Sequence, residues 1–258
     1  MVKKILSIAL WVITAAAIVV LFIFARENYL NTPVKAVNLH PASDSGFVRR
    51  SMLQKEIESY CEEYGRTKKI GTVDMVKIQK SLDANPWIES NAAHIGLDGN
   101  LNVNFKEYEP QLRVFGNNGR SAYVTSEGVV VPSCSNYTPY VLIASGNLNL
   151  PNDTVTYTLC DTLDSDRNVI NALYWFKAIT ANPFIENCVG QLYCNNNNEF
   201  ELTVKGLDAR VIVGDTCLAA DKLFRLETFM KQRLNRLETQ NLKTINLQYK
   251  NQIVCTKR

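Results

Sequence analysis

The stretch Ala84–Pro110, ANPWIESNAAHIGLDGNLNVNFKEYEP, contains the clearest run of structural signals in the chain. Asn85-Pro86 ends a preceding helix, because proline has no amide hydrogen to donate and restricts the residue before it. Asp98-Gly99 indicates a tight hairpin turn, in which glycine accepts a positive φ. Apolar and polar residues alternate after the turn, which predicts a strand with one buried face. The expected buried side chains are Leu101, Val103 and Phe105.

A later stretch follows a similar pattern. The residues ANPFIE at 181–186 echo ANPWIE at 84–89, and a turn at Asn195–Asn198 comes before a second alternating run. We expect a second helix-then-hairpin unit there, so that each of two small domains contains one. So short a similarity does not decide whether the two units share an ancestor.

The first apolar segment, Ile5–Ala25, contains no charged side chain. A helix of this length rises about 31 Å, enough to cross a hydrocarbon core of about 30 Å. The alternative is a cleaved signal peptide, which has a shorter apolar region that ends at small residues. Cleavage after the mid-span Ala15–Ala17 would leave the apolar stub Ile18–Phe24. We therefore expect an uncleaved anchor at 5–25 in the lipid bilayer, a cytoplasmic tail at 1–4 and the remainder outside the cytoplasm.

One strand and two helices are predicted between the anchor and the opening stretch. Val34–Leu39 is typical of a short strand, and a helix follows with Leu53 and Ile57 on its apolar face. A second helix spans about Asp74–Leu82. With the hairpin, the order is strand, helix, helix, strand, strand. This order fits two helices packed on one face of a three-stranded sheet.

Short strands dominate from Gln111 onward. A hairpin is predicted across Leu112–Thr125, and two amphipathic helices are predicted at Asp166–Thr180 and Cys217–Arg236. A last strand is expected at Leu242–Thr256. The predicted fold class is therefore α+β: an N-terminal transmembrane helix, a β-α-α-β-β domain and a strand-rich domain with flanking helices.

The motifs point away from catalysis. His40 and His94 have no Cys, Asp or Glu at metal-ligand spacing, and no GxSxG, P-loop, GxGxxG or HExxH sequence occurs. The net charge of +3, without a basic stripe, gives no case for nucleic-acid binding. We expect no catalytic residue, no metal site and no cofactor.

All seven cysteines follow the apolar segment, and no CxxC pair occurs among them. The odd number and the chain length argue against a dense disulfide framework. Cys188 and Cys194 would lie about 20 Å apart on one extended strand, too far for a disulfide. Small buried thiols are the expected state.

The predicted last strand, Leu242–Thr256, has one apolar face and ends the chain. A strand added last often lies at a sheet edge, where its free backbone groups can receive a partner strand. The sequence alone leaves two interpretations equally weighted: the strand completes the sheet, or it binds a partner. The preceding helix would supply a basic wall for an acidic partner. That wall would consist of Lys222, Arg225 and Arg233.

The order of these motifs resembles the bacterial cell-division family FtsQ, also called DivIB. The similar segments are NPWIESNAAHIGLDGNLNVNF with Glu107 and Pro110, SAYVTSEGVVVP, YTPYVLIASGNL, NPFIENCVGQLY, VIVGDTCLAADKLFRLETF and INLQYKNQIV. Each segment is short, and the resemblance rests on the order in which they occur. It covers nearly the whole chain. Two positions depart from the family pattern, because Tyr108 and Gln248 stand where arginine is common.

The resemblance implies a POTRA domain at 32–109, a β domain at 110–258 and a non-enzymatic scaffold in the inner membrane at the division septum. It implies FtsB-like and FtsL-like single-pass partners and control of septal peptidoglycan synthases. Family members receive the FtsB-like partner at the final edge, and Tyr249 matches the family's tyrosine. The implied docking residues are Leu247, Tyr249, Asn251 and Ile253.

Two other functions compete with this interpretation. A membrane-anchored enzyme acting on the envelope would need a nucleophile or an acid–base pair, and none is apparent. Another POTRA-bearing assembly or export adaptor would carry repeated POTRA modules or a membrane barrel, and neither appears in the sequence.

Overall fold

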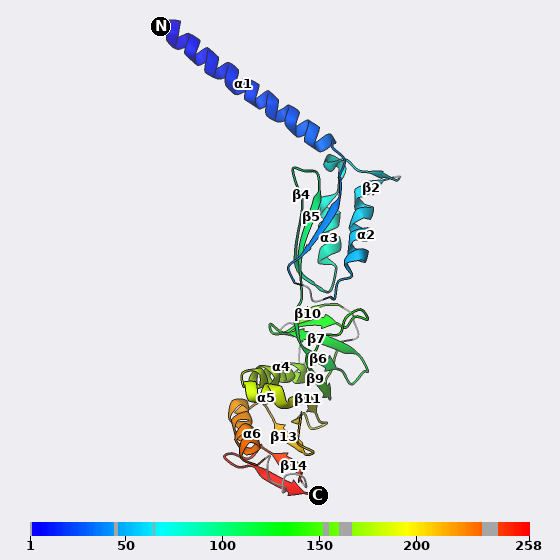
Figure 1. Cartoon of the computed structure of the whole chain (residues 1–258), viewed down its shortest axis with the longest axis vertical. Coiled ribbons are helices and arrows are strands. Elements are labelled where there is room, and N and C mark those ends of the chain that lie inside the picture. The colour runs from blue at the N-terminus through cyan, green and yellow to red at the C-terminus, as the bar shows by residue number, and fades with distance from the viewer. Residues whose placement is uncertain (1, 44–45, 64, 152–154, 160–166, 234–241) are drawn as a thin grey trace. The chain divides into compact units, whose positions relative to one another are not determined.

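A computed structural model describes residues 2–43, 46–63, 65–151, 155–159, 167–233 and 242–258. The chain divides into two compact units, one ending at Glu107 and the other beginning at Tyr108. The first unit opens with the long helix α1, Val2–Asn31 (Figure 1). Within α1, Ala9–Asn31 is long and apolar enough to cross a membrane, and it is the one such helix in the described part of the chain.

The rest of the N-terminal unit is a three-stranded sheet with two helices. The sheet order is β1-β5-β4, with β1 parallel and β4 antiparallel to the central β5. The predicted order of strand, helix, helix, strand, strand is present. A small hairpin and a 3-10 turn lie between the two helices. The elements are β1 Val37–Pro41, α2 Arg50–Cys61, β2 Glu62–Glu63, β3 Arg66–Thr67, η1 Ile70–Thr72, α3 Met75–Asp83, β4 Ile88–Ile95 and β5 Leu101–Glu107.

The alternation in the opening stretch correctly predicts which face of β5 is buried. Its three apolar side chains are at most 3% exposed and pack against the apolar faces of α2 and α3. Gly99 has φ +85°, as the tight turn requires. Asp74 caps α3, since its carboxylate accepts a hydrogen bond from the backbone N–H of Lys77 at 3.2 Å.

In its described residues, the C-terminal unit contains one ten-stranded sheet and three helices. The strand order is β10-β8-β7-β6-β9-β11-β12-β13-β14-β15. The elements are β6 Pro110–Phe115, β7 Ser121–Thr125, β8 Val129–Pro132, β9 Leu142–Gly146, β10 Tyr157–Thr158, α4 Arg167–Thr180, α5 Pro183–Cys188, β11 Val189–Cys194, β12 Phe200–Val204, β13 Arg210–Gly214, α6 Ala219–Arg233, β14 Leu242–Asn246 and β15 Val254–Lys257.

A single core joins these helices to the sheet. The three helices contact one another, and α4 also contacts β6 and β11 (Figure 1). Trp175 on α4 and Leu226 on α6 are fully buried in this core, together with strand residues such as Val211. The α+β class predicted from the sequence is confirmed.

Two expected elements differ in the structure. Leu242–Thr256 is not one strand: β14 and β15 pair as an antiparallel hairpin, and residues 247–253 connect them. The second Asn-Pro also acts differently from the first. Pro183 begins the short helix α5, because the Asn182 side chain accepts hydrogen bonds from the N–H groups of Phe184 and Ile185.

The cysteines agree only partly with the expectation of buried thiols. Cys61 and Cys194 are buried, whereas Cys217 and Cys255 are exposed. Cys188 ends α5 and does not share a strand with Cys194; both thiols are free. The expectation for Cys160 falls outside the described residues.

Candidate partner-binding edge

The strand at the end of the ten-stranded sheet is β15. It pairs with β14, and all four of its side chains are exposed, Val254 at 41%. The opposite end of the sheet is β10, which has only two residues. The longer of the two sheet ends is therefore formed by residues 254–257, and not by the whole predicted range.

Residues 247–253 form the connection between β14 and β15, which we call the β14–β15 loop. Leu247 is fully buried, and its N–H donates to the Ile212 carbonyl at 2.9 Å. Asn251 has φ +58°, a left-handed conformation that asparagine tolerates in turns. Ile253 is half-buried against the core, and Tyr249 is 54% exposed. Of the four implied docking residues, Leu247 has no surface to offer a partner.

The Arg225 side chain of α6 holds this loop through hydrogen bonds to the loop's backbone carbonyls. One guanidinium nitrogen, Nη1, donates to the carbonyls of Tyr249 at 2.9 Å and Gln252 at 2.7 Å, and Nη2 donates to that of Leu247 at 3.2 Å. Its Nε pairs with Asp221 at 2.9 Å. The fork of guanidinium donors suits this task, because several acceptors are satisfied at once. Arg225 is therefore committed within the chain and does not form a free basic wall.

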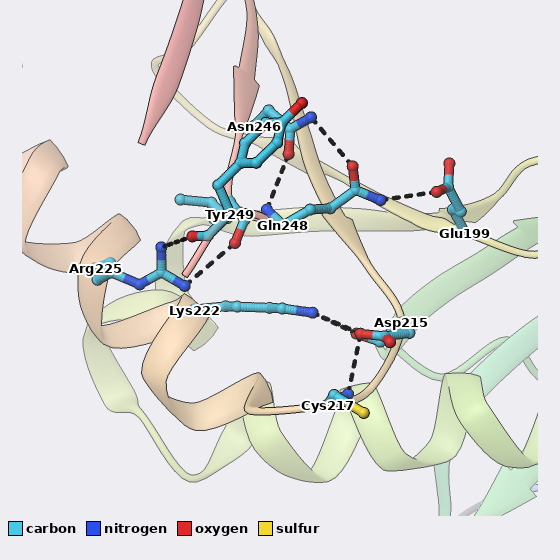
Figure 2. Close-up of polar contacts among 9 residues, drawn as sticks. Glu199, Asp215, Cys217, Lys222, Arg225, Asn246, Gln248 and Tyr249 are labelled. Atoms are coloured by element: carbon cyan, nitrogen blue, oxygen red, sulfur yellow. Dashed lines mark hydrogen bonds and ion pairs between the residues drawn. The ribbon is translucent and has the colours of Figure 1, made fainter. Parts of the chain in front are cut away.

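Lys222 is also committed within the chain, contrary to the sequence prediction. It is 5% exposed, and its Nζ donates to the carbonyl and to Oδ1 of Asp215, both at 2.8 Å (Figure 2). The ammonium lies 5.8 Å from the centre of the Trp175 ring. The hydrogen bond from Lys222 lowers the pKa of Asp215 below its usual value. Periodicity placed Lys222 on a wet face, although its long stem packs inward.

Arg233 is the last residue of α6. Its side chain falls outside the described part of the structure.

Gln248 makes a contact that the sequence did not reveal. Its side-chain amide donates to Glu199 at 2.8 Å, which joins the loop to the β11–β12 connection (Figure 2). Gly214, at φ +68°, leaves room for it, since a Cβ there would lie 2.6 Å from the Gln248 amide nitrogen. Gln248, which departs from the arginine that the resemblance led us to expect, is a neutral donor that reaches the carboxylate of Glu199.

The structure therefore brings together Tyr249, the strand β15 and the Arg225 support. This region offers the backbone of the end strand β15 and an exposed tyrosine in the loop that leads into it. Within the described ranges, no group of three or more His, Cys, Asp or Glu side chains could hold a metal ion.

Comparison with known families gives a match over the C-terminal unit. The family model described as FtsQ/DivIB, C-terminal related, matches residues 109–256, which is more than half of the chain. The match covers the ten-stranded sheet up to β15 and the three helices packed on it. No curated protein matches the chain.

Proposed function

The chain belongs to the FtsQ/DivIB C-terminal related family, and from that premise we propose that it is a non-enzymatic scaffold of the divisome. The family membership gives it a role in cell division and carries the proposal. In this role α1 anchors the chain in the inner membrane at the septum, with residues 1–4 in the cytoplasm. The β-α-α-β-β module, residues 32–109, serves as a POTRA domain, and residues 110–258 serve as the β domain.

The proposed partners are FtsB-like and FtsL-like single-pass proteins, through which the scaffold influences septal peptidoglycan synthases. The proposed acceptor is β15, to which a partner strand adds. Three observations support this choice: β15 ends the sheet order, its side chains are exposed, and Tyr249, in the loop that leads into β15, is 54% exposed. Backbone hydrogen bonds then give affinity, and the side chains next to the edge give specificity.

Pull-down of the full chain from membranes, with mass spectrometry of the captured proteins, tests the scaffold role. We expect the parent chain to capture single-pass division proteins. The Tyr249→Ala variant should capture clearly less of them. Tyr140→Ala is the matched control, because Tyr140 is 97% exposed and precedes β9, five strand positions from β15. That separation is about 24 Å across a sheet. Capture of the same partners by both variants would remove Tyr249 from the site.

Strand addition has a further test that uses the partner's backbone. Alternate N–H groups of an added strand face the edge, and the others face away. Two peptides from the extracytoplasmic part of the FtsB-like partner are therefore N-methylated, one at odd and one at even positions. Calorimetry should find one peptide that binds like the unmodified form and one that does not bind. Equal effects of the two patterns would exclude strand addition.

A further inference from the structure

The turn between β4 and β5, Gly96–Gly99, is fixed beside the last turn of α1. The Tyr29 hydroxyl of α1 lies within hydrogen-bonding distance of the carbonyls of Ile95 at 3.1 Å and Gly96 at 3.2 Å. Just after the helix, the N–H of Lys35 donates to the Gly99 carbonyl at 3.0 Å. These contacts hold one end of the turn to the last turn of α1 and the other end to the residues that follow α1.

The depth of this turn follows from helix geometry. Ala25 ends the uncharged segment, and Tyr29 lies one turn later, about 6 Å further along the axis. The headgroup region of each leaflet is roughly 5–8 Å thick. Side chains on a helix lean toward its N-terminus, so the Tyr29 hydroxyl and the carbonyls beside it lie back toward Ala25. If α1 spans the membrane, the β4–β5 turn reaches the headgroup region.

The side chain presented at this turn is apolar. Leu97 is 95% exposed, the most exposed large aliphatic side chain of the described residues. The Lys35 stem lies against Gly99 of the same turn. Asp98 is also in the turn, and Lys69 Nζ lies 3.1 Å from the Asn31 side chain at the end of α1. An exposed leucine with a lysine against the same turn fits the lipid–water boundary, where apolar side chains enter the acyl region and ammonium groups meet phosphates.

The same unit contains an exposed apolar residue at its other end. The carbonyl of Phe105, near the end of β5, accepts from Ala42, and the Glu107 carboxylate accepts from the N–H groups of Phe47 and Val48. The start of α2 is therefore held near the end of β5, about 20 Å from the turn along that strand. Met52 in the first turns of α2 is 59% exposed.

We propose that the β4–β5 turn is a second membrane contact, in which Leu97 enters the lipid interface and fixes the orientation of the N-terminal unit against the bilayer. This inference rests on the proposed anchoring by α1. The occupant of the surface is the lipid itself, and no partner protein is needed.

Photo-crosslinking to lipid tests the proposal. The full chain carries benzoylphenylalanine at one of three positions, Val19, Met52 or Leu97, and is reconstituted into vesicles of equal parts phosphatidylcholine and phosphatidylglycerol. After irradiation, mass spectrometry of proteolytic peptides measures the yield of lipid adducts. Val19 in α1 reports whether the helix is in the membrane, and Met52 reports collisions of an exposed apolar site distant from the turn.

We expect lipid adducts at positions 19 and 97 and no more than background at 52. Adducts at 19 with only background at 97 would overturn the membrane contact while leaving the anchor intact. Equal yields at 52 and 97 would also overturn it, because the turn would then show no preference. Absence of adducts at 19 would instead remove the anchor itself, and with it the membrane part of the proposed function.

Discussion

At the scale of single residues, Lys222 shows how a buried charge is kept in a fold. The Lys222 side chain is 6% exposed, whereas the side chain of its carboxylate partner Asp215 is 72% exposed. The pair therefore costs less than a fully buried one, because water still solvates the acid. The Lys222 residue is buried as a whole, and its ammonium lies 5.8 Å from the centre of the Trp175 ring. Its contribution to stability is expected to come mainly from packing.

Two substitutions of Lys222 separate packing from charge. Lys222→Ala removes the stem and should lower the free energy of unfolding by about 2–4 kcal/mol, as for other large-to-small core changes. Lys222→Met keeps a stem of similar length and should cost about 1 kcal/mol or less, because Asp215 can be hydrated. Urea titration of residues 32–258 followed by circular dichroism measures both. Equal losses would show that the charge, and not the packing, dominates.

The Asp215–Lys222 pair also predicts a dependence on pH. The pKa of Asp215 is lowered in the folded state, chiefly by the Lys222 hydrogen bond. Its contribution is therefore complete above the usual Asp pKa of about 3.9 and is lost as the pH falls through the lower folded value. Asp215→Asn should be less stable than the parent at pH 6, by at most about 1 kcal/mol, since the side chain is mostly exposed. The difference should shrink on acidification below about pH 4 and be absent in a Lys222→Met background.

At the scale of elements, local patterns predicted the hairpins well and the last strand poorly. The β4–β5 hairpin has Asp-Gly at its turn and strict alternation after it, so sequence and structure agree. Apolar and polar residues also alternate from Ile245 to Lys250, and this pattern predicted a strand that continues where the chain turns. The signal against a strand was the polar run Lys250–Gln252, in which Asn251 adopts a left-handed conformation. The tertiary contacts of Arg225 that stabilise this turn have no local signature.

Removing the Arg225 side chain should loosen the β14–β15 loop without unfolding the unit. Arg225→Ala deletes three hydrogen bonds to loop carbonyls and should cost about 1–3 kcal/mol. Hydrogen exchange followed by mass spectrometry should show faster exchange at residues 247–257 and little change in α4. Arg210→Ala is the matched control, because the Arg210 side chain is 65% exposed and its one ion pair within the described residues is with Glu201, at 3.6 Å. Unchanged exchange in the loop would mean that other contacts hold it.

The buried face of β5 gives a prediction for the N-terminal unit. Phe105 is 3% exposed, so Phe105→Asp places a charge in the core and should unfold this unit, with a cost of several kcal/mol. Asn104→Asp adds the same charge on the exposed face of the same strand and should change stability by about 0.5 kcal/mol or less. Limited proteolysis and localisation to division sites compare the two. Normal abundance and localisation of Phe105→Asp would show that the unit is dispensable for recruitment.

At the scale of the whole molecule, the order of short motifs was more informative than any one of them. Segments such as NPFIENCVGQLY are weak alone, but their sequence along the chain identified the family that the match over 109–256 shows. That order did not predict which side chains are exposed to a partner. Lys222 and Leu247 are buried by contacts with distant strands and helices, and one-dimensional periodicity does not contain such contacts.

Membrane topology provides the last prediction, and it concerns the whole chain. The helix α1 offers one candidate span, Ala9–Asn31, within which the uncharged segment ends at Ala25. If it stays uncleaved with the N-terminus in the cytoplasm, residues 32–258 lie on the far side of the membrane. A reporter that is active only in the cytoplasm should then be silent when it is fused after Arg258 and active when it is fused before Met1. Replacing Ala15 with Arg places a charge at mid-span, where it costs about 2.5–3.5 kcal/mol, and should increase cytoplasmic reporter activity in the C-terminal fusion. Activity of the parent C-terminal fusion would reverse the topology and, with it, the access of extracytoplasmic partners to β15.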